Sequence, residues 1–219
     1  QEPMRKIQTF IQMIDKNAED PAVTGKYLEK IDSSAKRMST LIIAILNYSR
    51  LTNYEEKYVR IDLNEVLEQV KTDYDLLLRE KAAVVESDSL PVIHGIPLQL
   101  SQLFSNLMSN SLKFSAAPAY IRIRSRLIPA GEMGVGSGIY QHTAFYELNF
   151  EDNGIGFDQQ YADQIFTMFR RLHSNQEYPG TGIGLALCKK IVENHRGYIR
   201  ASGQSGKGAS FLIYLPAPK

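Results

Sequence analysis

The sequence contains one cysteine, almost no net charge and no long apolar segment. The single cysteine, Cys188, cannot form a disulfide within the chain, which favours a reducing cytosol and a cytoplasmic location. A formal net charge of +1 excludes a strong long-range attraction to nucleic acid or to an anionic membrane. The longest purely apolar run, Leu41 to Leu46, is far shorter than the roughly 20 residues that span a membrane. We therefore expect neither nucleic-acid binding nor membrane contact by this chain.

A signal peptide and internal repeats are also missing. The chain begins with Gln1 instead of Met, so we expect it to be part of a longer protein. Its 219 residues suffice for one substantial domain and a smaller element.

Residues 1–57 read as two helices joined by turn residues at 17–25. The second helix carries an apolar residue at alternating steps of three and four, which is the spacing of a coiled-coil seam. The seam consists of Leu28, Ile31, Ala35, Met38, Ile42 and Ile45. Two antiparallel helices cannot cover this stripe alone, and each such side chain contributes roughly 1.5–3 kcal/mol when buried. We therefore predict a homodimer through residues 1–57, a dimeric four-helix bundle; the alternative is burial within one chain.

Residues 58–219 alternate between helical and strand patterns. DLNE (62–65) is a capping box in which Asp62 caps a helix that runs to about Glu80. Helices and antiparallel strands that are segregated along the chain indicate an α+β fold, an α/β two-layer sandwich. The further expected elements are a strand near 83–86, a helix at 97–114, strands at 120–128 and 145–150 around a loop at 130–138, a helix near 159–169, a helix after Gly184, and a hairpin of 198–201 and 210–215.

Three alternate glycines, Gly180, Gly182 and Gly184, stand before a helical pattern in YPGTGIGLALCKK (178–190). The Rossmann fingerprint needs G-x-G-x-x-G directly after a strand, and a P-loop needs Lys directly after its last glycine. Neither fits. A flexible glycine segment that leads into a helix N-terminus still favours an anion, because free amides and the helix dipole point at it. The alternative is an ordinary glycine-rich turn.

A carboxylate with two nearby glycines ends the strand pattern at EDNGIGFD (151–158). Asp152 is placed to accept a hydrogen bond from an exocyclic amine such as adenine N6. Gly154 and Gly156 allow the base to approach the backbone. The alternative is a plain Asp-Gly turn.

Two asparagines and a lysine share one face of the helix at 97–114, since Asn106, Asn110 and Lys113 stand at i, i+4 and i+7. Amide oxygens suit Mg²⁺, which commonly bridges to substrate phosphates, and Lys113 adds a positive charge for a triphosphate. The alternative is a pair of satisfied core amides.

Together, four segments resemble the motifs of sensor histidine kinases of two-component systems, in the family's order. SQLFSNLMSNSLKFS (101–115) resembles the N box, EDNGIGFD the G1 box, IFTMFRRLH (165–173) the F box, and YPGTGIGLALCKKIVENHRG (178–197) the G2 box. The resemblance implies a Bergerat-type ATP-binding domain after a dimerisation and phosphotransfer hairpin. QEPMRKIQTF (1–10) looks like the tail of a phosphoacceptor box of the phytochrome-like kind.

The resemblance also implies roles for individual residues. It gives Arg171 and Lys113 as catalytic phosphate contacts, Asn110 and Asn106 as Mg²⁺ ligands, and Asp152 as the adenine contact. Its ATP-binding set comprises Asn106, Asn110, Lys113, Asp152, Gly154, Gly156, the lid anchors Phe166 and Phe169, and Gly180, Thr181, Gly182, Gly184 and Leu185. Residues 170–180 would form a mobile lid.

The sequence departs from the family's pattern at three places. The acceptor histidine would lie three residues before Gln1. The four histidines present have structural explanations: His94 near a turn, His142 in a loop, His173 in the lid, and His195 as a cation or cap at a helix end. Glu2 replaces the Thr or Asn that many relatives use for phosphatase activity. Gln102 stands where ATP-hydrolysing relatives carry a glutamate base, and an amide cannot take a proton.

The function implied is transfer of the γ-phosphate of Mg-ATP to a histidine just upstream of Gln1, then to an aspartate of a response-regulator receiver domain. The implied partners are that receiver and an upstream sensor domain, and a hinge near 52–60 would align the reacting groups. Two alternatives remain: a Bergerat-fold ATPase, and a dimeric signalling module with a vestigial nucleotide site.

Overall fold

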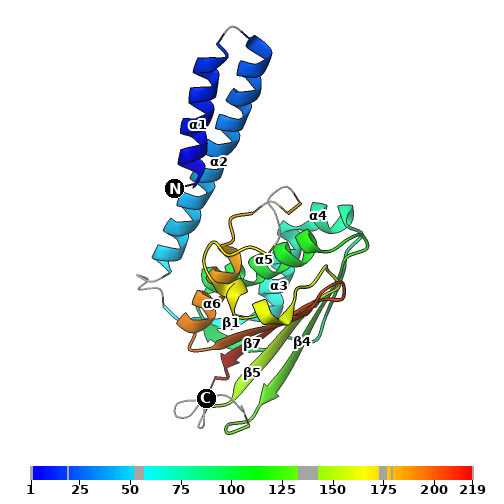
Figure 1. Ribbon diagram of the computed structural model, residues 1–219. Helices are drawn as coiled ribbons and strands as arrows, with labels where there is room; N and C mark the ends of the chain where they lie inside the picture. Colours follow the sequence, from blue (N-terminus) through cyan, green and yellow to red (C-terminus); the bar gives the residue numbers. More distant parts are fainter. Residues whose placement is uncertain are drawn as a thin grey trace. The chain divides into compact units, whose positions relative to one another are not determined.

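The computed structural model describes residues 2–18, 20–51, 57–132, 143–172, 177–178 and 180–218. The chain divides into two compact units, Gln1–Thr52 and Asn53–Lys219 (Figure 1). Among the described residues, no helix combines the length and apolar character that crossing a membrane requires.

The first unit is the predicted helical hairpin, formed by α1 (Glu2–Lys16) and α2 (Pro21–Arg50). The predicted turn at 17–25 is wrong in its second half, since α2 begins at Pro21. The reason is local: Asp20 Oδ1 accepts hydrogen bonds from the amides of Ala22 (3.0 Å) and Val23 (3.2 Å), and proline is favoured in a first helical turn.

Much of the apolar stripe on α2 is exposed in the single chain. Leu28, Ile42 and Ile45 of the predicted seam are 55%, 51% and 43% exposed, and the neighbouring Ile43 is 58% exposed. An uncovered row of large aliphatic side chains on a helix is a surface for another helix.

The second unit is a two-layer α/β sandwich, as predicted. A five-stranded sheet has the order β2-β4-β5-β7-β6, with β2 parallel to β4 and the other pairs antiparallel, and β1 pairs with β3 in a separate small sheet. In chain order the elements are β1 (Val59–Asp62), α3 (Leu63–Asp73), α4 (Asp75–Glu80), β2 (Val84–Ser87), β3 (Val92–Gly95), α5 (Pro97–Phe114), β4 (Tyr120–Ile128), β5 (Phe145–Asp152), the 3₁₀ turns η2 (Gln159–Tyr161) and η3 (Gln164–Phe166), α6 (Gly184–Asn194), β6 (Tyr198–Gln204) and β7 (Gly208–Pro216).

Helices α3, α5 and α6 cover one face of the large sheet (Figure 1). The apolar side of α5 is fully buried against that face; Phe104 meets Phe150 of β5 edge to face, with ring centroids 5.1 Å apart. Aromatic pairs of this geometry add about 0.5–1.5 kcal/mol to the burial of the rings. This packing fixes α5 relative to the end of β5, where Asp152 lies.

Several predicted elements need correction. The helix expected to run to Glu80 is broken at Tyr74 into α3 and α4. The helix expected near 159–169 is wrong: it is two short 3₁₀ turns, each closed by an i to i+3 hydrogen bond, Tyr161 N to Asp158 O and Thr167 N to Gln164 O.

The four-residue strands β1 and β3 were not predicted, because neither is long enough to show an alternating pattern. Residues 59 and 60 of the expected hinge belong to β1. Residues 52–56 of that hinge, and 133–138 of the expected loop, lie outside the described residues.

Strand β6 forms one edge of the large sheet, and a side chain covers part of it. Gln159 Oε1 accepts from the amide of Gly203 (3.0 Å), while its Nε2 donates to the carbonyl of Ala201 (3.4 Å). The side-chain amide thus satisfies two outward-facing backbone groups of this edge strand.

Candidate functional site

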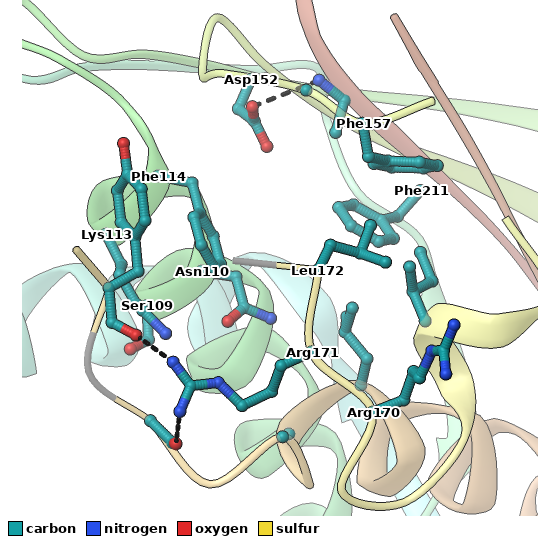
Figure 2. A pocket seen from close by; sticks show the side chains of 18 of the residues that line it. Ser109, Asn110, Lys113, Phe114, Asp152, Phe157, Arg170, Arg171, Leu172 and Phe211 are labelled. Carbon is teal, nitrogen blue, oxygen red and sulfur yellow. Dashed lines mark hydrogen bonds between the residues drawn. The ribbon is translucent and has the colours of Figure 1, made fainter. Parts of the chain in front are cut away.

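A cavity of about 280 Å³ lies between α5, the end of β5 and the start of α6. Most of the predicted site residues line it, namely Asn110, Lys113, Asp152, Gly156, Arg171, Gly180, Thr181, Gly182, Gly184 and Leu185. In Figure 2, Asp152 lies across the cavity from Arg171, with Asn110 and Phe114 on the α5 side and Phe157 and Phe211 opposite.

Four predicted residues do not line the cavity. Gly154 is next to the cavity residue Asp152, and its amide donates to Asp152 Oδ1 (2.9 Å). Phe166 is buried, whereas Phe169 is half exposed, with φ +64°, and its amide donates to Gly182 O (2.9 Å). Asn106 lies one turn before Asn110, and its Oδ1 is 3.6 Å from the position that a Cβ on Gly184 would take.

Asp152 is a mostly buried carboxylate held by three neutral donors. Its Oδ1 accepts from the amides of Gly154 (2.9 Å) and Ala209 (3.3 Å), and its Oδ2 from the hydroxyl of Ser111 (3.2 Å). Burial raises the pKa of the Asp152 carboxyl above its usual range, while these three hydrogen bonds oppose the shift. The remaining acceptor capacity of Oδ2 suits an amine donor.

Two cations face the opposite end of the cavity. Burial and the positive charge of Arg171 both lower the pKa of the Lys113 ammonium. The guanidinium of Arg171 donates to two carbonyls of the glycine segment, Tyr178 O (2.7 Å) and Gly180 O (3.1 Å) (Figure 2). Two like charges brought together in a partly buried site favour an anion between them.

The glycines allow close approach of main chain and side chains around this end. An alanine Cβ at position 180 would lie 2.8 Å from Lys113 Nζ, so the ammonium lies against the backbone there. Gly156 and Gly182 have φ of +61° and +74°, values that side-chain-bearing residues rarely adopt.

Sequence reasoning missed the apolar wall and the hydroxyl behind Asp152. Phe157, Ile165, Leu172 and Phe211 line the cavity between its polar ends, as in most small-molecule sites. Their apolar character reads as ordinary core in the sequence. Ser111 follows Asn110 directly and carries no pattern that would connect it with residue 152.

The donor set for a divalent cation consists of amides. Within the described part of the chain, no cluster of three His, Cys, Asp or Glu side chains could hold a metal. Asn110 lines the cavity, and Nδ2 of Asn106 is buried without a hydrogen-bond partner in that same part of the chain. Two amides can hold Mg²⁺ when phosphate oxygens and water complete the shell, so the residues fit a metal that binds together with a nucleotide.

Of the two roles expected for His195, the helix cap is confirmed, since it is the C-cap residue of α6, and the cation is wrong. The side chain is 3% exposed, its Nε2 accepts from the amide of Ile96 (3.0 Å), and its Nδ1 donates to Ile191 O (2.7 Å). Burial lowers its pKa, so the ring is neutral and joins the end of α6 to the start of α5. His94 is exposed on β3, and His142 and His173 lie outside the described residues.

Comparison with protein families matches residues 95–219 to the family described as histidine kinase-, DNA gyrase B-, and HSP90-like ATPase. Cyanobacterial phytochrome A of Nostoc sp. is 32% identical over 218 residues, which cover 99% of this chain and 27% of that protein. The chain spans about a quarter of the length of such curated relatives.

Two solved structures have the same fold. Full-length ShkA in complex with AMPPNP aligns with a TM-score of 0.66 at 21% identity, over 91% of this chain and 40% of that one. Histidine kinase ThkA in complex with the response regulator protein TrrA aligns with a TM-score of 0.65 at 21% identity, over 99% and 58% of the two chains. Both likenesses concern the fold, a helical hairpin followed by an α/β sandwich.

Proposed function

Because the chain belongs to the family of histidine kinase-, DNA gyrase B- and HSP90-like ATPases, we propose that it is the catalytic core of a sensor histidine kinase. It binds Mg-ATP in the cavity and transfers the γ-phosphoryl group to a histidine. One observation carries the proposal: Asp152 lies at one end of the cavity, and the cations Lys113 and Arg171 lie at the other. Among the described residues, Asp152 forms no ion pair. That polarity matches a nucleotide, with an amine at one end and phosphates at the other.

Asp152 binds the exocyclic amine of adenine through Oδ2, and the apolar wall packs against the base. Lys113 and Arg171 bind the phosphates, and Arg171 exchanges its two carbonyl partners for a phosphate oxygen. Burial and the positive charge of Arg171 lower the pKa of Lys113, and the bound anion then compensates the two neighbouring charges.

Asn110 and Asn106 would hold the Mg²⁺ ion, which neutralises phosphate charge when it is bound. The protein's own contribution is positioning and charge neutralisation. An imidazole nitrogen attacks the γ-phosphorus, the bond to the β-phosphate oxygen breaks, and ADP leaves.

The acceptor imidazole is the histidine that the sequence pattern predicts three residues upstream of Gln1. His195 cannot serve, because both of its nitrogens are engaged in a buried site. We propose that the phosphoryl group passes on to a response-regulator aspartate. The complex of ThkA with its response regulator supports this assignment for a chain of the same fold.

Steady ATP hydrolysis is the weaker alternative. The residue one turn before Asn106 is Gln102, whose Nε2 donates to Asn106 Oδ1 (3.4 Å). An amide at this place can orient water but cannot remove its proton.

Titration calorimetry with Mg-ATP tests the binding site. We expect saturable binding by the chain, and a loss of about 10- to 100-fold in affinity for Asp152→Asn, because a charged acceptor is removed. The matched control is Asp75→Asn on α4, an exposed carboxylate that pairs with Arg79 and should leave affinity unchanged. Binding that is indifferent to Asp152→Asn would overturn the assignment.

Phosphotransfer is tested on the protein extended upstream of Gln1, incubated with ATP labelled at the γ-phosphate. We expect an acid-labile, alkali-stable phosphoprotein that disappears when the predicted histidine is replaced. Multiple turnover of ATP without any phosphoprotein would instead support the ATPase alternative.

A further inference from the structure

Ser111 is a buried hydroxyl that donates to the carboxylate of Asp152. The residue is 2% exposed on α5, and its Oγ lies 3.2 Å from Asp152 Oδ2. A hydroxyl has one proton to donate, and here that proton is directed at the site instead of at the helix.

Three other hydroxyls in helices of this chain behave differently. Ser34, Thr40 and Thr72 each donate to the carbonyl four residues before them. That bond is the ordinary local choice for such a residue in a helix. Ser111 forgoes it for a carboxylate on another element, which suggests a role outside the helix.

The two oxygens of Asp152 have different surroundings. Oδ1 accepts from two backbone amides and faces the protein, whereas Oδ2 accepts from the Ser111 hydroxyl within the described residues. No ion pair within this part of the chain includes Asp152. Among the described residues, Ser111 is therefore the one side chain that donates directly to the oxygen that faces the cavity.

We propose that Ser111 is a positioning residue that sets base selectivity: by donating to Oδ2, it holds this oxygen as an acceptor for the exocyclic amine of adenine. The proposal rests on the proposed function and deepens it. An acceptor fixed at this place binds an amino group at position 6 of the purine and repels an oxo group there. Without Ser111, the two amides still hold Oδ1, but Oδ2 loses its hydroxyl donor and is less firmly kept as an acceptor, which weakens the distinction.

The test compares ATP with purine riboside 5′-triphosphate, which has hydrogen in place of the 6-amino group. Calorimetry on the chain with Mg²⁺ gives the ratio of the two affinities. For the unmodified protein we expect ATP to bind about tenfold more tightly, since one charge-assisted hydrogen bond is gained. For Ser111→Ala we expect this ratio to fall to about two- to threefold.

Measuring both nucleotides also distinguishes a change in base selectivity from a folding defect of the Ser111→Ala variant. A loss of structure would weaken both nucleotides equally and leave their ratio unchanged. The matched control is Ser105→Ala on the same helix, which removes a partly buried contact with the Tyr74 hydroxyl (3.1 Å) and should keep the ratio.

The outcomes are distinct. A reduced ratio in Ser111→Ala with the analogue still bound supports the proposal. An unchanged ratio overturns it while leaving the proposed function intact. If the unmodified protein binds neither nucleotide, the proposed function itself fails.

Discussion

Asp152 illustrates at the residue scale how a site can reduce the stability of its own fold. Burial raises the pKa of this carboxyl, so the folded chain binds a proton there more tightly than the unfolded chain does. As pH rises above the ordinary pKa of an aspartate, about 3.9, the ionised group therefore lowers the free energy of unfolding.

Replacing Asp152 by asparagine should stabilise the nucleotide-free protein while impairing ATP binding. At neutral pH the neutral amide avoids the cost of a buried charge and keeps an oxygen for the amides of Gly154 and Ala209. We expect a gain on the order of 1 kcal/mol, seen as a higher melting temperature. Melting curves without nucleotide check this, with Asp75→Asn as the exposed control. A lower melting temperature at pH 7 would contradict it.

Substitution by alanine should affect stability at Gly156 and ATP affinity at Gly180. Gly156 has φ +61°, and an added Cβ would lie 2.1 Å from the carbonyl oxygen of Gln204. Gly156→Ala should therefore destabilise the fold by about 3 kcal/mol or more. Among the described residues, an added Cβ at Gly180 meets only the flexible end of Lys113, so Gly180→Ala should fold normally and bind ATP more weakly. Urea unfolding and calorimetry on both variants separate the effects; equal stabilities would refute the contrast.

At the scale of elements, His195 joins two helices and the first residues of the second unit. Its Nε2 accepts from Ile96 at the start of α5, and its ring lies 5.4 Å from that of Tyr58. The hydroxyl of Tyr58 donates to the carbonyl of Asn194 at the end of α6. Burial raises the pKa of the Tyr58 hydroxyl, and the positive charge of Arg196 opposes this shift.

The buried imidazole should make stability depend on pH. Burial lowers the pKa of His195 in the folded state, so only the unfolded chain takes up this proton as pH falls below the ordinary value. Stability is fully present above about pH 6.5 and decreases below it. Urea unfolding between about pH 7.5 and 5.5 should show this loss, and His195→Gln should show less of it.

The same variant should cost about 2–3 kcal/mol at neutral pH, because two buried hydrogen bonds are disturbed. The unmodified protein and His195→Gln have the other histidines in common. The difference between their pH profiles of stability is therefore due to His195. Identical profiles would contradict the prediction.

The sequence predicted the elements with strong periodicity, and most of the residues singled out for their chemistry line one cavity. Helix α5 and strand β4 have the predicted bounds, because their apolar residues recur at regular spacing over many positions. The bond from Ser111 to Asp152 and the carbonyl partners of Arg171 could not be predicted. The first joins residues that are distant in sequence, and the second depends on the conformation of a loop. Neither kind of contact leaves a pattern in the sequence.

At the scale of the whole molecule, the exposed stripe on α2 indicates association of two chains. Ile42→Asp together with Ile45→Asp places charges on this stripe and should convert a dimer to a monomer. Light scattering coupled to size exclusion measures the mass, and ATP affinity should not change. Thr40→Asp is the control, since Thr40 is exposed and two residues from both Met38 and Ile42, hence on the other side of the helix. A double variant that stays dimeric would contradict the bundle.

The hydrogen bonds from the Gln159 side chain to β6 affect whether copies of this protein can associate through the edge of the sheet. An unprotected outer strand recruits strands from neighbouring molecules and leads to sheet growth and fibrils. The Gly203 N–H and the Ala201 C=O are already hydrogen-bonded to Gln159, so the backbone of a second molecule cannot pair with them. Strand addition by a second molecule is therefore hindered at this stretch of the β6 edge.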